Sequence, residues 1–199
     1  NPYTLTDDDR TVIGNTTPKF SGGFGLNATF KGFDVSAFFN FMYDFDVFNA
    51  NKVMMTTWAS NNYNNFSMDI SAAKRWRNFD DMGNEIRYSP EILAEFNKNA
   101  TMWNPTSIGR PIAMSYAVED GSFLRLNTAT IGYTLPRAWT NKVGLSRVRF
   151  YASGYNLFTI TGYSGYDPEV DIATGLTPNI DNNRYPRSRT YTFGVQLTF

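Results

Sequence analysis

The stretch that decides the fold is residues 190–199, which read TYTFGVQLTF. Apolar and polar positions alternate along it, which is the pattern of a β-strand with one apolar face. The apolar phase holds Tyr191, Phe193, Val195, Leu197 and Phe199. Aromatic residues near both ends of such a face are typical of strands that cross an outer membrane, where they lie at the two interfaces.

Two further runs with the same alternation cover residues 19–30 and 33–44. Only Lys31-Gly32 separates them, and a two-residue connection between alternating runs predicts a tight hairpin. Each run has about 11 residues, the length that crosses a bilayer at a tilt of roughly 45°. Strands of a soluble β-sandwich, the alternative architecture, are usually shorter, and there the aromatic phase would form the core.

Two more strands are expected at residues 122–134 and 147–158, and the opening stretch belongs to a fifth at residues 189–199. In the first of them the apolar phase changes between Leu126 and Ala129. A β-bulge near Asn127-Thr128 would bring both halves onto one face, so a bulge is predicted there.

The charged residues of the strands test this assignment, because a lipid-facing Arg or Lys at mid-bilayer costs about 2–4 kcal/mol. The apolar phase of the regular strands carries no charge. Four charged side chains are expected on the other phase, in an ion-pair lattice inside the wall or against a plug domain: Asp34, Arg125, Arg147 and Arg149. The predicted fold class is all-β, an antiparallel transmembrane β-barrel.

The connections between the expected strands alternate between short and long. Outer-membrane barrels have short periplasmic turns and longer extracellular loops, so residues 44–121 and 159–188 are expected to be extracellular. The first loop is expected to be partly helical, with Ser89-Pro90 at the start of a short helix and one or two helical turns within residues 67–77. About five strands cannot close a membrane barrel, which needs at least eight, so we expect residues 1–199 to be the C-terminal portion of a larger one.

Composition excludes several classes of function. Lys+Arg and Asp+Glu number 18 each, without the basic excess that nucleic-acid-binding proteins usually show. Histidine and cysteine are absent from the sequence, which excludes a Ser-His-Asp triad and Cys/His metal sites within it. The acids that could suggest Ca²⁺ match no calcium loop and are interpreted as solvent-exposed: Asp7, Asp8, Asp9, Asp167, Glu169 and Asp171. We expect no cofactor, no metal and no enzyme activity.

A set of short stretches resembles the C-terminal region of SusC/RagA-type TonB-dependent outer-membrane transporters of Bacteroidota. The order and spacing of these stretches carry the resemblance, which is weak between residues 51 and 116. The stretches are VIGN (12–15), PKF (18–20), KGFD (31–34), SAFF (36–39), VEDGSFLRL (118–126), GYTLP (132–136), NLFT (156–159), GYDPE (165–169), YP (185–186) and RTYTFG (189–194).

The resemblance implies a 22-stranded barrel with an N-terminal plug domain, which this sequence does not contain. It implies import of oligosaccharides or peptides, with energy supplied through TonB and a SusD-like surface lipoprotein as partner. It also implies that the barrel-assembly machinery recognises a C-terminal strand ending in an aromatic residue. Tyr191, Phe193 and Phe199 are therefore the candidate insertion signal, and main-chain pairing to an exposed edge is its physical basis.

The long loop contains a second set of candidate residues, all aromatic. They are expected either to contact a ligand or the lipoprotein, or to pack the loop against itself: Trp58, Tyr63, Phe66, Trp76 and Trp103. For the whole chain, the expected function is that of a wall segment of an importer. The alternative is a barrel fragment that serves as a substrate or structural partner of another outer-membrane complex, such as barrel assembly, without transport activity of its own.

Overall fold

The structure is a computed structural model, and it describes residues 8, 10–58, 65–106, 113–169 and 179–199. The chain divides into two compact units. We call them the sheet unit (Asn1–Val47, Val118–Ile180 and Arg184–Phe199) and the insert unit (Phe48–Ala117 and Asp181–Asn183).

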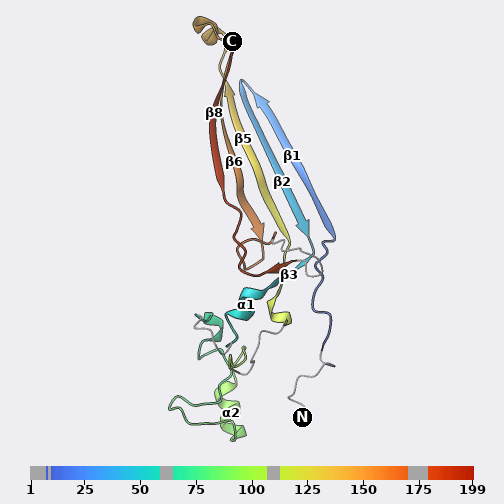
Figure 1. The fold of residues 1–199 in the computed structure, drawn as a ribbon, viewed down its shortest axis with the longest axis vertical. Helices are drawn as coiled ribbons and strands as arrows, with labels where there is room; N and C mark the ends of the chain where they lie inside the picture. Colours follow the sequence, from blue (N-terminus) through green and yellow to red (C-terminus); the bar gives the residue numbers. More distant parts are fainter. Residues whose placement is uncertain (1–7, 9, 59–64, 107–112, 170–178) are drawn as a thin grey trace. The chain divides into compact units, whose positions relative to one another are not determined.

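Five long strands form the sheet unit's main sheet and lie side by side in one layer (Figure 1). Their order is β1-β2-β5-β6-β8, and every neighbouring pair is antiparallel. Their bounds are β1 Phe20–Phe30, β2 Phe33–Tyr43, β5 Phe123–Thr134, β6 Arg147–Thr161 and β8 Thr190–Thr198. The predicted antiparallel sheet is confirmed, and β6 continues to Thr161, beyond its expected end.

The connection between β1 and β2 is the tight turn expected at Lys31-Gly32. Both residues have positive φ, 47° for Lys31 and 89° for Gly32. Two consecutive residues in this region match the right-handed twist of the strands that they join, which is why such turns dominate two-residue hairpins. The turn sets the register, so that Phe30 pairs with Phe33 and Phe20 with Tyr43.

The predicted bulge in β5 is also present. On the β2 side, Phe38 pairs with Thr128 and Phe39 with Leu126, so Asn127 is the extra residue. On the β6 side, Leu126 pairs with Phe158 and Thr128 with Tyr155, so the register shifts at the same place in β5. Because one extra residue reverses the alternation, the apolar residues before and after the bulge lie on the same face.

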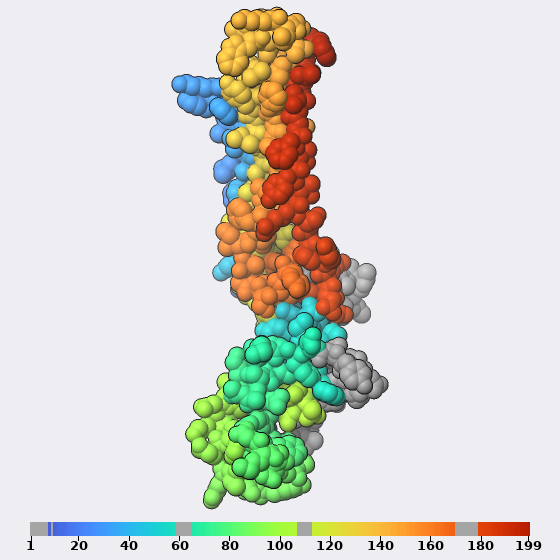
Figure 2. All heavy atoms as spheres, turned by 90° about the vertical axis from the view of Figure 1, so that its left-hand side faces the viewer, coloured from blue at the N-terminus to red at the C-terminus, as the bar shows by residue number. Residues whose placement is uncertain are grey.

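The register therefore assembles a continuous apolar face across all five strands. Its larger members are Phe20, Phe24, Leu26, Phe30, Phe33, Val35, Phe39, Phe41, Leu124, Leu126, Ile131, Tyr133, Phe150, Phe158, Ile160, Tyr191, Phe193, Val195 and Leu197. Figure 2 shows β8 as a red column of side chains beside β6. The soluble-sandwich alternative requires this face to be core, but Phe193 is 80% exposed and Phe30 70% exposed.

A small core lies in the sheet unit around the end of β2 and the start of β5. Phe45, Val47, Phe123 and Tyr163 are buried there, with Met42 packed against them. The Phe45 and Phe123 rings meet edge to face, with centroids 6.5 Å apart. A second sheet has the order β4-β3-β7, formed by β3 Asp46–Asn49, β4 Val118–Asp120 and β7 Ile180–Asp181.

The remaining elements are short helices. The β5–β6 connection holds α3 Arg137–Thr140 and η4 Asn141–Val143, and the other helices are α1 Ala50–Met54, η2 Met68–Ile70, α2 Pro90–Asn97 and η3 Ser115–Ala117. Helix α2 starts at Pro90 with Ser89 at the N-cap position, as expected, although the Ser89 side chain makes no capping hydrogen bond. Within the described residues no helix is both long and apolar enough to span a membrane.

Of the one or two helical turns expected within residues 67–77, one is present as η2. It ends at Ser71, which leaves the helical region with φ −55° and ψ 159°. The Ser67 hydroxyl accepts a hydrogen bond from the Asp69 amide and caps this single turn. The extracellular position of the segment stays a prediction.

Candidate functional site

The face of the sheet opposite the apolar one is polar, and it carries an ion pair that spans three strands. Arg149 of β6 donates from Nε to Oδ1 of Asp34 in β2 over 2.9 Å, and its Nη2 contacts the other carboxylate oxygen. Strand β5 lies between the two partners. The guanidinium therefore crosses β5 to reach its carboxylate.

Glycines at matching register positions make this crossing possible. Asp34, Gly132, Tyr151 and Gly194 are successive cross-strand partners. A methyl group at Gly132 would lie 2.6 Å from Nε of Arg149, and one at Gly194 would overlap the Tyr151 ring. Large and small residues alternate along this row, so that Arg149 lies over Gly132 and Tyr151 lies over Gly194.

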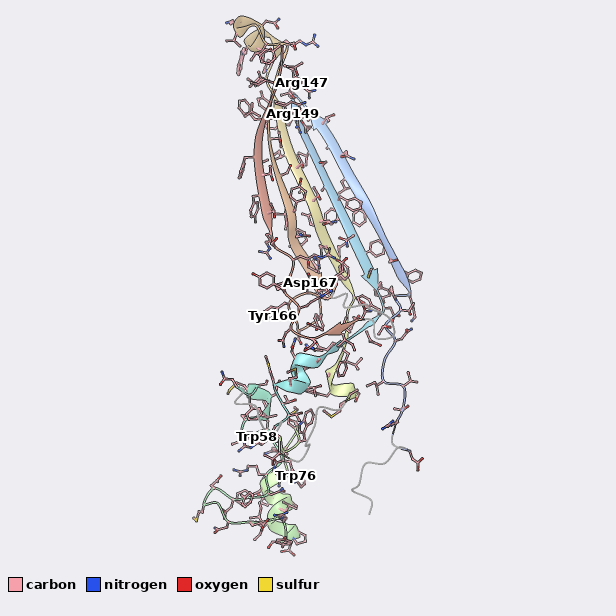
Figure 3. The ribbon with its side chains drawn as sticks, in the orientation of Figure 1. Trp58, Trp76, Arg147, Arg149, Tyr166 and Asp167 are labelled. Carbon is pink, nitrogen blue, oxygen red and sulfur yellow. The ribbon has the colours of Figure 1, made fainter. Side chains whose placement is uncertain are left out.

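The other end of the polar face carries a second, more buried cluster of charges. Arg125 of β5 is 2% exposed and donates from both terminal nitrogens to the Asp167 carboxylate. Its Nε lies 3.7 Å from Oε2 of Glu169, whose other oxygen lies 2.8 Å from Nη2 of Arg187. Figure 3 shows Asp167 at one end of the sheet, with Arg147 and Arg149 toward the other.

The surroundings of Asp167 act on its pKa in opposite directions. Burial raises the pKa of this carboxyl, while the hydrogen bonds from Arg125 and from the Glu169 amide lower it, and the net pKa lies below the ordinary value of 3.8. Asp167 is therefore ionised at neutral pH. The interpretation of Asp167 as a solvent-exposed loop acid is wrong, because the residue is only 8% exposed and paired.

The four charged residues expected in one lattice are thus divided. The structure brings Asp34 and Arg149 together, while Arg125 pairs with loop residues at the opposite end. Arg147 donates to the Thr134 hydroxyl over 3.5 Å. Sequence reasoning missed Gly132, since only the register shows that it lies beneath the guanidinium. It named Asp167 but missed the pairing of this residue with Arg125.

The candidate insertion residues lie in or beside the edge strand β8. Register places Tyr191 opposite Gly154 and Phe193 opposite Ala152, both on the apolar face. Tyr191 is 62%, Phe193 80% and Phe199 90% exposed. Among the described strands, β8 pairs only with β6, so its other edge is available for pairing.

The aromatic candidates of the insert unit fall into two groups. Trp103 packs edge to face on Tyr116 and donates from Nε1 to the Thr56 carbonyl over 3.0 Å, so it packs the segment internally. Trp58 and Phe66 form a ring pair, with centroids 5.7 Å apart. Trp58 is 47% and Trp76 41% exposed. Both are labelled in Figure 3, and Tyr63 lies outside the described residues.

A metal centre finds no support in the part of the chain that the structure describes. No group of three or more His, Cys, Asp or Glu side chains there could hold a metal ion. Of the acids considered for Ca²⁺, Asp7, Asp9 and Asp171 lie outside the described residues.

Comparisons with known proteins place the chain among TonB-dependent receptors. No family model matches it. It is 32% identical over 201 residues to a TonB-dependent receptor of Formosa agariphila, covering 98% of this chain and 18% of that protein. It is also 32% identical over 164 residues to the TonB-dependent receptor SusC of Bacteroides thetaiotaomicron, covering 75% of this chain and 15% of SusC.

Solved structures give the same result as the sequence comparisons. The RagAB peptide importer in its "closed-closed" state matches with a TM-score of 0.73 and the "open-open" state with 0.69, each at 25% identity over 98% of this chain and 19% of that chain. The chain thus spans less than a fifth of the length of these relatives. Their names are those of receptors and importers, in keeping with the expectation that this chain is not an enzyme. By sequence and by fold, the chain belongs to the SusC/RagA-type family of TonB-dependent outer-membrane transporters.

Proposed function

We propose that this chain supplies five strands to the wall of an outer-membrane importer, as the C-terminal portion of its barrel. The observation that carries the proposal is the division of the sheet into two faces. Large apolar side chains cover one face of all five strands, while Asp34, Arg125 and Arg149 lie on the other. A barrel wall needs this arrangement, because lipid contacts one face and the interior the other.

We further propose that the complete protein imports oligosaccharides or peptides, with energy from TonB and a SusD-like lipoprotein as partner. The support is the similarity to a receptor named SusC and to a chain of the RagAB peptide importer. The segments 44–121 and 159–188 would face the cell exterior.

The wall proposal predicts opposite outcomes for the same substitution on the two faces. Phe193 and Thr192 are adjacent in β8 and point to opposite faces. Phe193→Arg would expose a charge to lipid at a cost of about 2–4 kcal/mol, whereas Thr192→Arg would place it in the interior. We expect Phe193→Arg in the full-length protein to reduce the heat-modifiable folded band and Thr192→Arg to preserve it. Equal folding of the two variants would contradict the wall proposal.

The import proposal is tested by uptake into cells that express the full-length protein with its neighbouring lipoprotein. Fluorescent oligosaccharides and oligopeptides are supplied separately, with and without a protonophore. We expect one substrate class to accumulate, and accumulation to stop when the proton gradient collapses. Uptake that survives the protonophore would contradict energy supply through TonB.

The exposed aromatic residues of the insert unit are the proposed ligand or lipoprotein contacts. Trp58 and Trp76 are the best placed, because each exposes about half of its side chain. We expect Trp58→Ala and Trp76→Ala to lower uptake without changing the amount of folded protein. Trp103→Ala serves as the matched control, since its indole is used internally and its loss should lower folding first.

A further inference from the structure

The apolar face is not evenly filled by side chains. A groove of about 460 Å³ lies on it, near the end of the sheet that carries the Lys31-Gly32 turn. Side-chain size explains it. Ala152 is the small residue of its row, with the larger Ile131 and Phe193 as its cross-strand neighbours. The groove is lined by Phe33, Ile131, Gly132, Tyr133, Phe150, Tyr151, Ala152, Phe193, Gly194 and Val195.

The end of the sheet next to this groove is basic. There the Thr134 amide donates to the Gly32 carbonyl over 2.8 Å, which brings the β1–β2 turn against the end of β5. The basic residues at this end are Lys31, Arg137, Lys142, Arg147 and Arg149. Among the described side chains of these strand ends and connections, the acidic one is Asp34, which is bound to Arg149. The β5–β6 connection, residues 135–146, contains no acidic residue.

The same connection exposes apolar side chains next to its charges. Trp139 of α3 is 61% exposed and Val143 of η4 is 69% exposed, while Arg137 and Lys142 are exposed beside them. An indole with neighbouring basic side chains is suited to a membrane–water interface, where the ring lies among headgroups and the cations reach phosphate. An acidic protein partner would use the charges but would leave the groove unexplained.

We propose that the groove and the basic end together bind one anionic phospholipid. An acyl chain lies over Ala152, and the headgroup phosphate lies among Lys31, Arg137 and Lys142. The length fits, since the path along the extended chain from Ile131 in β5 to Leu135, just after its end, is about 13 Å, within the reach of an acyl chain. The inference rests on the proposed function, because it requires the apolar face to contact lipid.

The test uses the full-length protein, delipidated in detergent and titrated with phosphatidylglycerol or phosphatidylcholine of identical acyl chains. Native mass spectrometry reports the bound fraction. We expect tighter binding of phosphatidylglycerol. Combining Lys31→Gln, Arg137→Gln and Lys142→Gln should weaken it by about tenfold or more and weaken phosphatidylcholine binding less, so that the preference for phosphatidylglycerol falls. Ala152→Leu, which fills the groove, should weaken both lipids.

Matched controls separate the site from general effects of charge and size. Lys74→Gln, Arg87→Gln and Lys98→Gln together change the charge equally in the insert unit. Ala28→Leu adds the same bulk on the apolar face of β1, outside the groove. Neither control should change lipid binding.

Several results would overturn the proposal. These are equal binding of the two lipids by the unsubstituted protein, an unaltered preference in the triple variant, or normal binding by Ala152→Leu. Inorganic phosphate that competes fully with the lipid would also overturn it, by showing a headgroup site alone. If the triple variant does not assemble, lipid binding is measured instead for the single variants Arg137→Gln and Lys142→Gln. Failure of the wall proposal appears separately, in the Phe193 and Thr192 comparison.

Discussion

At Gly132 the polar face has room for the Arg149 side chain because this position has no Cβ. We expect Gly132→Ala to destabilise the folded barrel by about 1–3 kcal/mol, since the methyl group would overpack against Nε of Arg149 and displace the guanidinium from Asp34. The urea midpoint of the full-length protein in detergent measures the change.

Gly25 offers the matched control for this substitution. A methyl group there would lie 3.7 Å from its nearest neighbour, the Ala37 carbonyl oxygen, which is an ordinary contact. Gly25→Ala should leave the midpoint unchanged or raise it slightly, because alanine restricts the unfolded chain. A midpoint that falls equally in both variants would contradict the role assigned to Gly132.

The Arg125–Asp167 pair predicts a loss of local stability in acid. The folded pKa of Asp167 lies below 3.8, its ordinary value, so the ionised carboxylate stabilises the fold above that pH. This stabilisation is lost as the pH falls through the folded pKa. We expect amide hydrogens of residues 162–169 to be protected at pH 7 and to lose protection as the pH falls below 3.8 and through the folded pKa of Asp167.

The control for this pH effect is Asp167→Asn, compared with the unsubstituted protein at each pH so that intrinsic exchange rates cancel. The variant should exchange faster at pH 7 and at the same rate once the pH is below the folded pKa of Asp167. A difference that persists undiminished in acid would contradict the assignment of the effect to the Asp167 charge.

At the residue scale, the sequence predicts which face of its strand a side chain lies on but does not predict its partner. Alternation placed Asp34 and Arg149 on the polar phase of their strands, because period 2 is a local property. Their pairing depends on the order of β2, β5 and β6, and nothing local encodes that order. The interpretation of Asp167 fails for the same reason, since its partner Arg125 lies 42 positions away in sequence.

At the scale of elements, the bulge at Asn127 keeps β5 amphipathic along its whole length. Deleting Asn127 would remove the extra residue and turn one half of the strand over. Either Leu124 and Leu126 or Ile131 and Tyr133 would then point to the polar face. We expect the deletion to abolish the heat-modifiable folded band of the full-length protein.

Deletion of Asn141, in the exposed β5–β6 connection, is the control for the loss of one residue. Loops tolerate such changes far better than paired strands, so assembly should continue. Normal assembly without Asn127 would show that the register shift is dispensable.

The elements were predictable where their signal lies in the chain itself. The hairpin at Lys31-Gly32 and the bulge in β5 follow from alternation and spacing, and both are confirmed. Of the one or two helical turns expected within residues 67–77, one forms as η2, and the spacing of apolar residues alone does not show that Ser71 ends it in an extended conformation.

At the scale of the whole molecule, the aromatic residues in and beside β8 are candidates for recognition during barrel assembly. We propose that Tyr191, Phe193 and Phe199 are recognised when the edge of β8 is captured through its main chain. Deleting Phe199 from the full-length protein should slow the appearance of folded barrel in a reconstituted assembly reaction. Phe158→Ala, on the apolar face of β6, is the control and should leave the rate unchanged.

A rate that is equal in the two variants would assign these residues to lipid contact alone. The outcome does not depend on transport, since assembly precedes it. It therefore tests the partner predicted for insertion separately from TonB and the lipoprotein.

The Asp34–Arg149 contact has a mechanical consequence for the sheet. Strands β2 and β6 are each hydrogen-bonded to β5, and they are also joined directly by a link that does not pass through the β5 backbone. Peeling β5 away at this end would therefore not separate its neighbours. The sheet has redundancy there, so β2, β5 and β6 should yield to a pulling force together, as one unit.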